Sequence, residues 1–503
     1  MAGKPIGNTW LQEKLKIKEF HLTHQSNLGS RSKIEIQPDG TVYETYQANY
    51  ALSKDTPLSH LEFALKYDNL QLDFYKSVFH KIPFKEVAIY VDSAPTSKYA
   101  RKIGYWYEFL TGKKLPVNNR EKGNYADLLE CEKYYTGKII KNARWLINDN
   151  LPGGAEFCPV VRKTNMLTDA LSTDVAKQIL ELRKQYPPEI FNRTNNYLYK
   201  KETRSSFQIE KEEPTPERIE RFISLLNKAG EEDIKEVLSE RSLIALQKLI
   251  VDKRFAAKGF RDFQNYIGQT SWNYEELIHY ICPPPDYLSS LMQGLSYAAK
   301  KSEGVHPIVR ATIIAFGFVF IHPFEDGNGR IHRFLVHDIL TRDKIVPKGM
   351  ILPISAHMFN NMKQYDEALE VYSKPLLSKI KYSKTGEQEL MVLNPSDVEA
   401  YYRFPDLTAQ TQYLAEVVNS TIVTDMPREF FFLQSYDEVK KHIQQKVDMP
   451  DKLIDLFIKF THHNEGVFPK GRRKHFSMLT DKELSDLQNI YRKVFGKNKS
   501  DNS

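Results

Sequence analysis

The sequence predicts a mainly α-helical protein of several domains, and three observations carry this prediction. Apolar residues recur at three- and four-residue spacing along most of the chain, as they do in amphipathic helices. Alternation of apolar and polar residues, the pattern of a half-buried strand, is clear only near the N-terminus, at 33–37 and 41–46. The chain has 503 residues, which at about 150 residues per domain corresponds to roughly three domains.

The composition excludes several classes of protein. Hydrophobic residues make up 41% and charged residues 27%, which is typical of a globular chain and not of a disordered one. The net charge of +7 is mild for this length and does not by itself indicate a nucleic-acid partner. The longest apolar run, 311–321, is well short of the roughly 18 residues that a membrane span needs, and the first ten residues lack the apolar stretch of a signal peptide. Cys131, Cys158 and Cys282 lie far apart, which indicates neither a disulfide framework nor a zinc site. We therefore expect a cytoplasmic protein with no membrane partner.

We expect the first domain to cover residues 1–190. A β-hairpin is predicted where 33–37 and 41–46 flank a Pro-Asp-Gly turn. Helical periodicity follows at 59–79 and 99–115, and in the second stretch Gly112 marks a helix end. The aromatic cluster in that stretch could be a ligand box, but large aromatics at helical spacing usually fill a core.

Two further regions follow. A second helical domain is expected over 191–384, interrupted by the charged, proline-containing segment 211–220. A polar connector at 384–390 then leads into apolar patterns such as 451–460 and 481–495, which predict a C-terminal helical module over 385–503.

The segment 321–335, IHPFEDGNGRIHRFL, carries the densest chemistry. The run before it is too apolar for a surface helix, and Pro323 disfavours helical geometry at His322, so a buried helix should end there and present this histidine. Gly327, Asn328 and Gly329 tolerate left-handed backbone angles and can turn several N–H groups towards one anion. A second helix starting at once would aim its positive N-terminus at the same point.

Charged residues complete this segment. Arg330 and Arg333 are three apart and share a helix face, and Asp326 is a hard oxygen ligand suited to Mg²⁺. Such a set suits transfer of a phosphate-containing group to a hydroxyl. The alternative is a glycine-rich turn between two helices with surface arginines and a capping aspartate.

The residues HPFEDGNGRIHR resemble the signature of the Fic family, His-Pro-Phe-x-Asp/Glu-Gly-Asn-Gly-Arg-x-x-Arg, at every defined position. Upstream, 264–268 and 281–295 look like the family's flap and the helix that follows it. Downstream, Asn361 and Tyr365 match a family segment in which Asp366 replaces a second tyrosine. The flanking regions are similar to those of large bacterial members. The resemblance implies a helical core with a short β-hairpin flap, at about 267–282, and a signature loop at 322–333.

Family members mostly transfer AMP from ATP to a Ser, Thr or Tyr hydroxyl of a protein. The resemblance implies that His322 is the general base and that Asp326 holds Mg²⁺. Gly327, Asn328, Gly329, Arg330 and Arg333 would bind the phosphates, and Asn361 and Tyr365 would contact the nucleotide. Phe324 would anchor the loop, and the flap would dock an unknown target protein by strand addition.

Many family members inhibit themselves with a helix reading Ser/Thr-x-x-x-Glu-Gly/Asn. The best match is at about 203–212, where Ser206 and Glu210 are four apart, although Lys211 stands where the family has Gly or Asn. A weaker match near Glu35 lies in hairpin-like sequence. We expect Glu210 to pair with Arg333.

The sequence thus predicts a Mg²⁺-dependent protein adenylyltransferase restrained by Glu210. Alternatives with the same site residues are removal of AMP from a modified protein, or transfer from another nucleotide or phosphodiester donor. An alternative of another class is a nucleic-acid-binding regulator with an inactive core, using the basic run 470–475, although that run is short and lacks interleaved aromatics. His332 and His337 are five apart and do not share a helix face, so they do not indicate a metal site.

Overall fold

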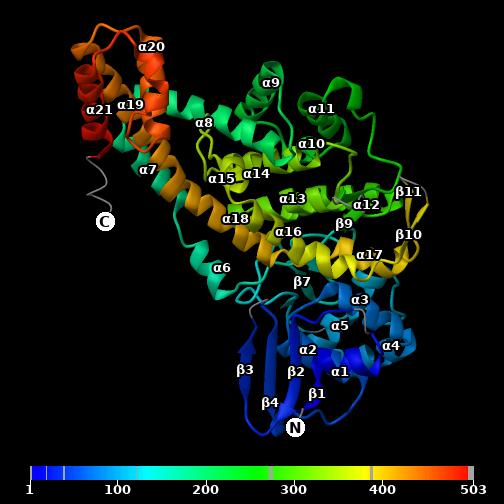
Figure 1. Ribbon diagram of the computed structural model, residues 1–503. Coiled ribbons are helices and arrows are strands. Elements are labelled where there is room, and N and C mark those ends of the chain that lie inside the picture. The colour runs from blue at the N-terminus through cyan, green and yellow to red at the C-terminus, as the bar shows by residue number, and fades with distance from the viewer. Residues whose placement is uncertain are drawn as a thin grey trace.

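The computed structural model describes residues 3–17, 20–37, 40–121, 123–270, 276–385 and 389–496. Helices dominate these ranges, with four small sheets between them, so the predicted fold class is confirmed (Figure 1). None of the helices in the described ranges is both long and apolar enough to cross a membrane.

The N-terminal part combines a four-stranded sheet with five helices. Its elements are β1 (Lys4–Ile6), α1 (Gly7–Lys14), β2 (His24–Gly29), β3 (Lys33–Ile36), β4 (Val42–Gln47), η1 (Ala48–Tyr50), α2 (Pro57–Tyr67), α3 (Leu72–Lys81), α4 (Phe84–Ser93) and α5 (Lys98–Thr111). The predicted hairpin is confirmed as the antiparallel pair β3–β4, in which Ile36 faces Val42, while Pro38 and Asp39 of its turn lie outside the described residues. The strand order is β1-β2-β4-β3, with β2 parallel to β4.

The stretch 59–79 forms two helices, not one continuous periodic segment. The chain turns to an extended conformation at Asp68, whose buried carboxylate accepts hydrogen bonds from the Asn8 N–H group and the Ser26 hydroxyl. These bonds connect Asp68 to α1 and β2 and keep the chain at this residue out of the helix. The predicted C-cap at Gly112 is confirmed, with φ of 69°. The aromatic cluster on α5 is mainly core, with Tyr105, Trp106 and Tyr107 buried.

A three-stranded sheet, in the order β5-β7-β6, leads into the helical middle of the molecule. These strands are β5 (Ala126–Asp127), β6 (Ile140–Asn142) and β7 (Ile147–Asp149). The middle then comprises α6 (Asn165–Ala170), α7 (Val175–Gln185), α8 (Pro188–Ile209), α9 (Pro216–Asn227), α10 (Ile234–Val237), α11 (Glu240–Ile250), η2 (Lys253–Phe255), β8 (Tyr266–Thr270), β9 (Glu276–Ile281), α12 (Pro285–Lys301), α13 (Pro307–Ile321), α14 (Asn328–Arg342), α15 (Ile354–Asn360) and α16 (Met362–Leu377). Helix α13 lies at the centre, and every residue from Ile308 to Ile321 is buried, as its apolar sequence predicts.

The C-terminal part begins with a hairpin and ends in a helical bundle, at the upper left of Figure 1. Its elements are β10 (Tyr382–Thr385), β11 (Glu389–Val392), α17 (Pro395–Arg403), α18 (Thr408–Ser420), η3 (Thr421–Asp425), α19 (Met426–Lys446), α20 (Asp451–His463), η4 (Lys470–Phe476) and α21 (Asp481–Gly496). The apolar core that contains α13 continues as far as Phe430, and a separate core runs from Val439 to Val494. The expected boundaries at 190 and 384 stay predictions.

Candidate functional site

Helix α13 ends by presenting His322 beside the start of α14. Its N–H group donates to the Phe318 carbonyl (2.9 Å), and its φ of 51° turns the chain out of the helix. The ring Nδ1 lies 3.1 Å from the Val319 carbonyl. Because a carbonyl can only accept, we assign the proton to Nδ1, which leaves Nε2 as a proton acceptor. Burial, reinforced by the positive charge of Arg261, lowers the pKa of His322 to about 4, although the Val319 carbonyl, Glu210 and Asp326 act in the opposite direction.

The loop after His322 ends at Gly327, whose φ of 92° starts α14. The first intrahelical hydrogen bond runs from the Ile331 N–H to the Gly327 carbonyl (3.0 Å), so the N–H groups before Ile331 have no partner within the helix. Phe324 is fully buried, as expected for an anchor. The amide of Asn328 donates to and accepts from the Phe324 backbone, at 2.8 and 3.1 Å. This side chain therefore closes the loop and does not face the cradle, as we call the backbone N–H groups of 327–329. These N–H groups are left to receive an anion.

Arg333 is buried and held by the end of α8. Its Nε donates to the Ser206 hydroxyl (2.8 Å), and its Nη2 donates to the Ser206 carbonyl (2.7 Å) and to Glu210 Oε1 (2.8 Å). Burial lowers the pKa of Arg333, but Glu210, together with Tyr365 and Glu202, acts in the opposite direction and the net shift is upward. Within the described residues its Nη1 is buried and has no hydrogen-bond acceptor.

Glu210 lies directly over the first turn of α14. A Cβ atom added to Gly329 would be 2.1 Å from Glu210 Oε1 and 3.3 Å from Arg333 Nη1. The carboxylate thus occupies the position at this helix N-terminus where an anion is favoured. Glycine at position 329 is what allows so close an approach.

The turn that positions Glu210 is a Schellman motif at the end of α8. The Lys211 N–H donates to the Gln208 carbonyl (2.9 Å) and the Glu212 N–H to the Phe207 carbonyl (3.1 Å). Lys211 has φ of 59°, which is the left-handed conformation that this motif needs. This geometry accounts for the Gly or Asn that the resemblance leads one to expect there.

Arg330 is also occupied by carboxylates. It is fully buried and pairs with Asp326 (2.6 Å) and with Glu212 (2.8 Å), and its Nη1 donates to the Ile250 carbonyl (3.2 Å). Its guanidinium also lies 5.2 Å from the centre of the Phe207 ring. The end of α8 therefore engages both arginines of the loop, Arg333 through Glu210 and Arg330 through Glu212.

Asp326 could contribute to a metal site but could not form one alone. Its Oδ1 accepts from the Gly327 N–H (2.6 Å) and from Arg330, its side chain is about half exposed, and Oδ2 accepts no hydrogen bond from a described residue. The described ranges hold no group of three or more His, Cys, Asp or Glu side chains placed to bind a metal ion. One carboxylate fits Mg²⁺ only if phosphate oxygens and water supply the other ligands, as they commonly do.

The remaining expected residues lie at varying distances from this loop. Tyr365 is buried with its ring 6.5 Å from that of His332, and burial raises its pKa to about 12. Asn361 joins α15 to α16 and donates to the His357 carbonyl (2.9 Å), with no recorded bond to the loop. His332 and His337 face different partners, the Ala315 carbonyl and Glu202.

Glu212 and Arg261 also contact the loop, although neither is expected from the sequence. Glu212 lies two residues after Glu210 in the same acidic stretch, which is the one signal that could have pointed to it. Arg261 donates to the His322 carbonyl across a separation of 61 residues, and no local pattern marks it.

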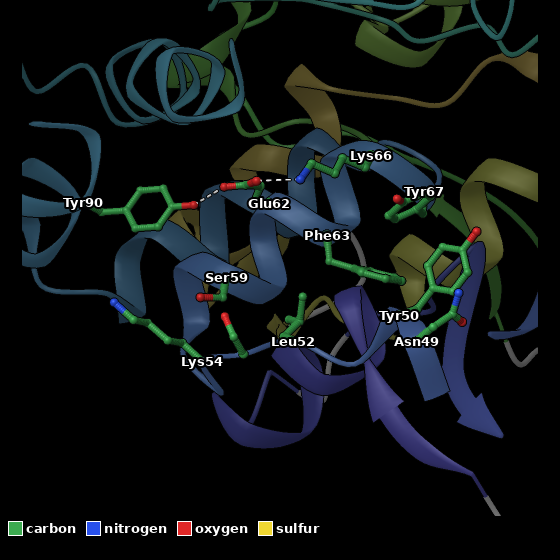
Figure 2. Close-up of a pocket in the computed structure, with 11 residues that line it drawn as sticks. Asn49, Tyr50, Leu52, Lys54, Ser59, Glu62, Phe63, Lys66, Tyr67 and Tyr90 are labelled. Carbon is green, nitrogen blue, oxygen red and sulfur yellow. Dashed lines mark hydrogen bonds and ion pairs between the residues drawn. The ribbon is translucent and has the colours of Figure 1, made fainter. Parts of the chain in front are cut away.

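A further cleft, of about 470 Å³, lies in the N-terminal part, away from this loop (Figure 2). Tyr50, Phe63 and Tyr67 form an aromatic wall, and Glu62 accepts hydrogen bonds from Tyr90 and Lys66. Its lining carries none of the expected site residues.

Part of the chain that includes this loop is similar to known proteins. Residues 237–340 match the model of the Fic/DOC family. Protein adenylyltransferase Fic of Drosophila mojavensis is 34% identical over 96 residues, 19% of this chain and 17% of the relative. The protein of the same name from Nematostella vectensis is 37% identical over 70 residues, 14% of this chain and 16% of the relative. The chain thus matches only about a sixth of the length of these curated relatives.

Two solved structures are similar to this chain over about half of its length. A Fic family protein from Desulfovibrio desulfuricans G20 has 18% sequence identity and a TM-score of 0.38, over 53% of this chain and 76% of that chain. A Fic domain containing signaling protein from Bacteroides thetaiotaomicron has 16% identity and a TM-score of 0.36, over 52% of this chain and 97% of the other. The match over 237–340 takes in α13, the signature loop and most of α14, so this segment of the chain carries a Fic/DOC domain.

Proposed function

We propose that this protein transfers AMP from ATP to a hydroxyl group of a target protein and that Glu210 restrains the reaction. The observation that carries the proposal is the unpartnered, buried Nη1 of Arg333, which lies beside Gly329 at the N-terminus of α14. A buried donor without an acceptor is costly, and an anionic oxygen at this position would satisfy it. Relatives of the 237–340 segment named protein adenylyltransferase support the choice of reaction.

In the proposed reaction His322 removes a proton from the attacking hydroxyl. Its Nε2 can accept because Nδ1 is engaged with the Val319 carbonyl. The hydroxyl oxygen bonds to the α-phosphorus as the bond to the departing pyrophosphate breaks. The backbone N–H groups of Asn328 and Gly329 hold the α-phosphate, on which charge develops, and that of Gly327 joins them when it leaves Asp326. A hydroxyl and an α-phosphate held in line need no further covalent partner from the protein.

The outer phosphates would be bound by the two arginines. Arg333 binds the γ-phosphate once Glu210 leaves it, and for Arg330 to bind phosphate a phosphate oxygen would replace Glu212. Asp326 would hold Mg²⁺, which when bound supplies positive charge against the α- and β-phosphates. Tyr365, buried near Arg333, is placed by the proposal on the nucleotide side of the site.

Restraint by Glu210 follows from its position. Its carboxylate takes one donor of Arg333 and lies over the cradle, so a triphosphate bound beside it would be displaced. A displacement of about 1 Å can lower a rate on the order of a hundredfold. The β8–β9 hairpin, with Ile267 and Leu277 partly exposed, is the proposed docking strand for the target.

The test uses ATP labelled at the α-phosphate, with self-modification as the readout. We expect label on Glu210→Gly, at least tenfold less on the wild type, and none on Glu210→Gly combined with His322→Ala. A γ-phosphate label should stay off the protein in every case, because the pyrophosphate departs. Glu213→Gly, an exposed carboxylate three residues away, is the matched control and should behave as the wild type.

Other outcomes would contradict the proposal. Nucleotide binding without label on any form would favour removal of AMP or another donor, and release of AMP from a modified protein would then distinguish these two. Absence of nucleotide binding together with steeply salt-dependent DNA binding would favour the regulator.

A further inference from the structure

Arg261 is a buried cation that donates to carbonyl groups alone. Its side chain is 6% exposed, and burial lowers its pKa. Its Nε donates to the His322 carbonyl (2.9 Å), its Nη1 to the Phe263 carbonyl (2.7 Å) and its Nη2 to the Pro283 carbonyl (2.7 Å). Within the described ranges, all the acceptors of its side chain are carbonyl groups and none is a carboxylate. Burying a charge without a counterion is costly, and here three carbonyl acceptors compensate for it.

The three carbonyl groups belong to segments that the proposed reaction must align. Phe263 lies just before β8 and Pro283 just after β9, so both ends of the hairpin are bound to one guanidinium. The third carbonyl belongs to the proposed base itself. The Arg261 N–H also donates to the Pro323 carbonyl (2.9 Å), which adds a second link to the same loop.

The bond to His322 supports a residue whose backbone conformation is unfavourable. A non-glycine residue with φ near +50° costs about 1–2 kcal/mol relative to a right-handed conformation. The N–H of His322 bonds to Phe318 and its carbonyl to Arg261, so the peptide groups on both sides are fixed. The ring direction follows from that backbone and from the Nδ1 bond to Val319.

We propose that Arg261 is a positioning residue that sets the β8–β9 hairpin in register with the His322 base. This inference rests on the proposed AMP transfer, since it gives the hairpin its role in presenting the target hydroxyl. Gln264 Nε2 also joins the two ends, through the Asn265 and Cys282 carbonyls (3.0 and 2.7 Å), but it makes no bond to the signature loop. The Asn265 amide donates to the Phe324 carbonyl of that loop (3.5 Å) from the β8 end alone. Among the described residues, Arg261 is the one whose side chain bonds to both ends of the hairpin and also to His322.

The test compares Arg261→Met and Arg261→Lys in the Glu210→Gly background, measuring kcat for AMP transfer and the dissociation constant of ATP separately. Arg261 makes no recorded contact with the start of α14, so we expect ATP affinity to change less than threefold. We expect kcat to fall about a hundredfold in Arg261→Met, the loss associated with misalignment of about 1 Å. Arg261→Lys keeps the charge, but its three donors share one nitrogen and cannot reach carbonyls that three separate guanidinium nitrogens contact. A loss of at least tenfold is therefore expected, and full activity would overturn the proposal.

Arg101→Met is the matched control, because Arg101 is 4% exposed and its Nη1 donates only to the Asn124 and Leu146 carbonyls of the N-terminal part. It should leave kcat unchanged, and an equal loss of kcat would assign the effect to general instability. Hydrogen exchange supplies a readout that does not depend on activity. Arg261→Met should raise exchange at both 276–283 and 318–325, and Arg101→Met at neither. If the Glu210→Gly parent takes up no label, the proposed reaction is wrong. The role of Arg261 is then decided by hydrogen exchange alone, and unchanged exchange at either segment would overturn it.

Discussion

Lys211 adopts a backbone conformation that suits glycine or asparagine. Its side chain is exposed, so its cost comes from φ of 59° and is about 1–2 kcal/mol. That cost falls on the turn that positions Glu210 against Arg333. In the proposed function, the departure from the family pattern at this residue therefore weakens the restraint by Glu210 without removing it.

Substitutions of Lys211 should change the basal reaction in opposite directions. We expect Lys211→Gly to lower AMP transfer by the otherwise unaltered chain several-fold, because it relieves the strained turn. We expect Lys211→Val to raise transfer several-fold, because β-branched residues disfavour positive φ. The α-phosphate label measures both. An equal effect of the two substitutions would show that the side chain, and not the backbone, matters at this position.

The ring of His322 should stay neutral well below the pH at which an exposed histidine gains a proton. With its pKa lowered to about 4 by burial, the base is available at pH 5 to 7, whereas an ordinary histidine would be lost as pH falls through about 6.5. Between these two pKa values, His322 is protonated in the unfolded chain and neutral in the folded chain. It therefore makes the free energy of unfolding rise with pH in this range. An NMR titration of its ring in the wild type, assigned with His322→Ala, checks this. A midpoint near 6.5 would contradict it.

At the scale of elements, a buried hydrogen-bond network fixes α8 to α14 and α15. Glu202 is 1% exposed, lies 2.7 Å from His337 Nε2 on α14, and accepts from the Ser355 N–H (2.7 Å) and hydroxyl on α15. This network lies two turns before Glu210. It therefore fixes where along α14 the turn that carries Glu210 makes contact.

Removing Glu202 should destabilise the fold. Glu202→Ala leaves His337 and Ser355 buried without their partner, and we expect a loss of about 3–5 kcal/mol in the free energy of unfolding. Denaturant unfolding measures it. Glu189→Ala, on an exposed position of the same helix, should cost under about 1 kcal/mol. Comparable losses in the two variants would mean that the network contributes little.

Which elements the sequence could predict depends on how local their determinants are. The β3–β4 hairpin and the C-cap of α5 have short-range signals, and both are confirmed. Strand β1 has three residues and β2 is mostly polar, so neither shows alternation, and the parallel pairing of β2 with β4 depends on contacts distant in sequence. The break before α3 depends likewise on the bonds of Asp68 to Asn8 and Ser26.

The same reasoning applies to the candidate site. The loop from His322 to Arg333 is continuous in sequence, so its residues were predictable and the structure brings them together with Ser206 and Glu210. The closed orientation of Asn328 and the pairing of Arg330 with Glu212 were not, since both depend on the packed conformation.

At the scale of the whole molecule, α8 joins the C-terminal bundle to the signature loop (Figure 1). Near its start Arg193 pairs with Asp437 of α19 (2.6 Å), and the rings of Phe191 and Phe430 lie 5.1 Å apart. Its last turn carries Ser206 and leads into Glu210. The helix belongs to the main apolar core from Phe191 to Phe207, both of which are buried.

In the proposed function, this anchoring makes Glu210 an intramolecular competitor of the γ-phosphate for Arg333. Even short flexible tethers give effective concentrations in the millimolar range, and a folded helix restricts its end further. Dilution of the protein therefore cannot weaken the competition. A signal that starts the reaction has to act on the few residues after Phe207, because the rest of α8 could leave Arg333 only if the core opened with it.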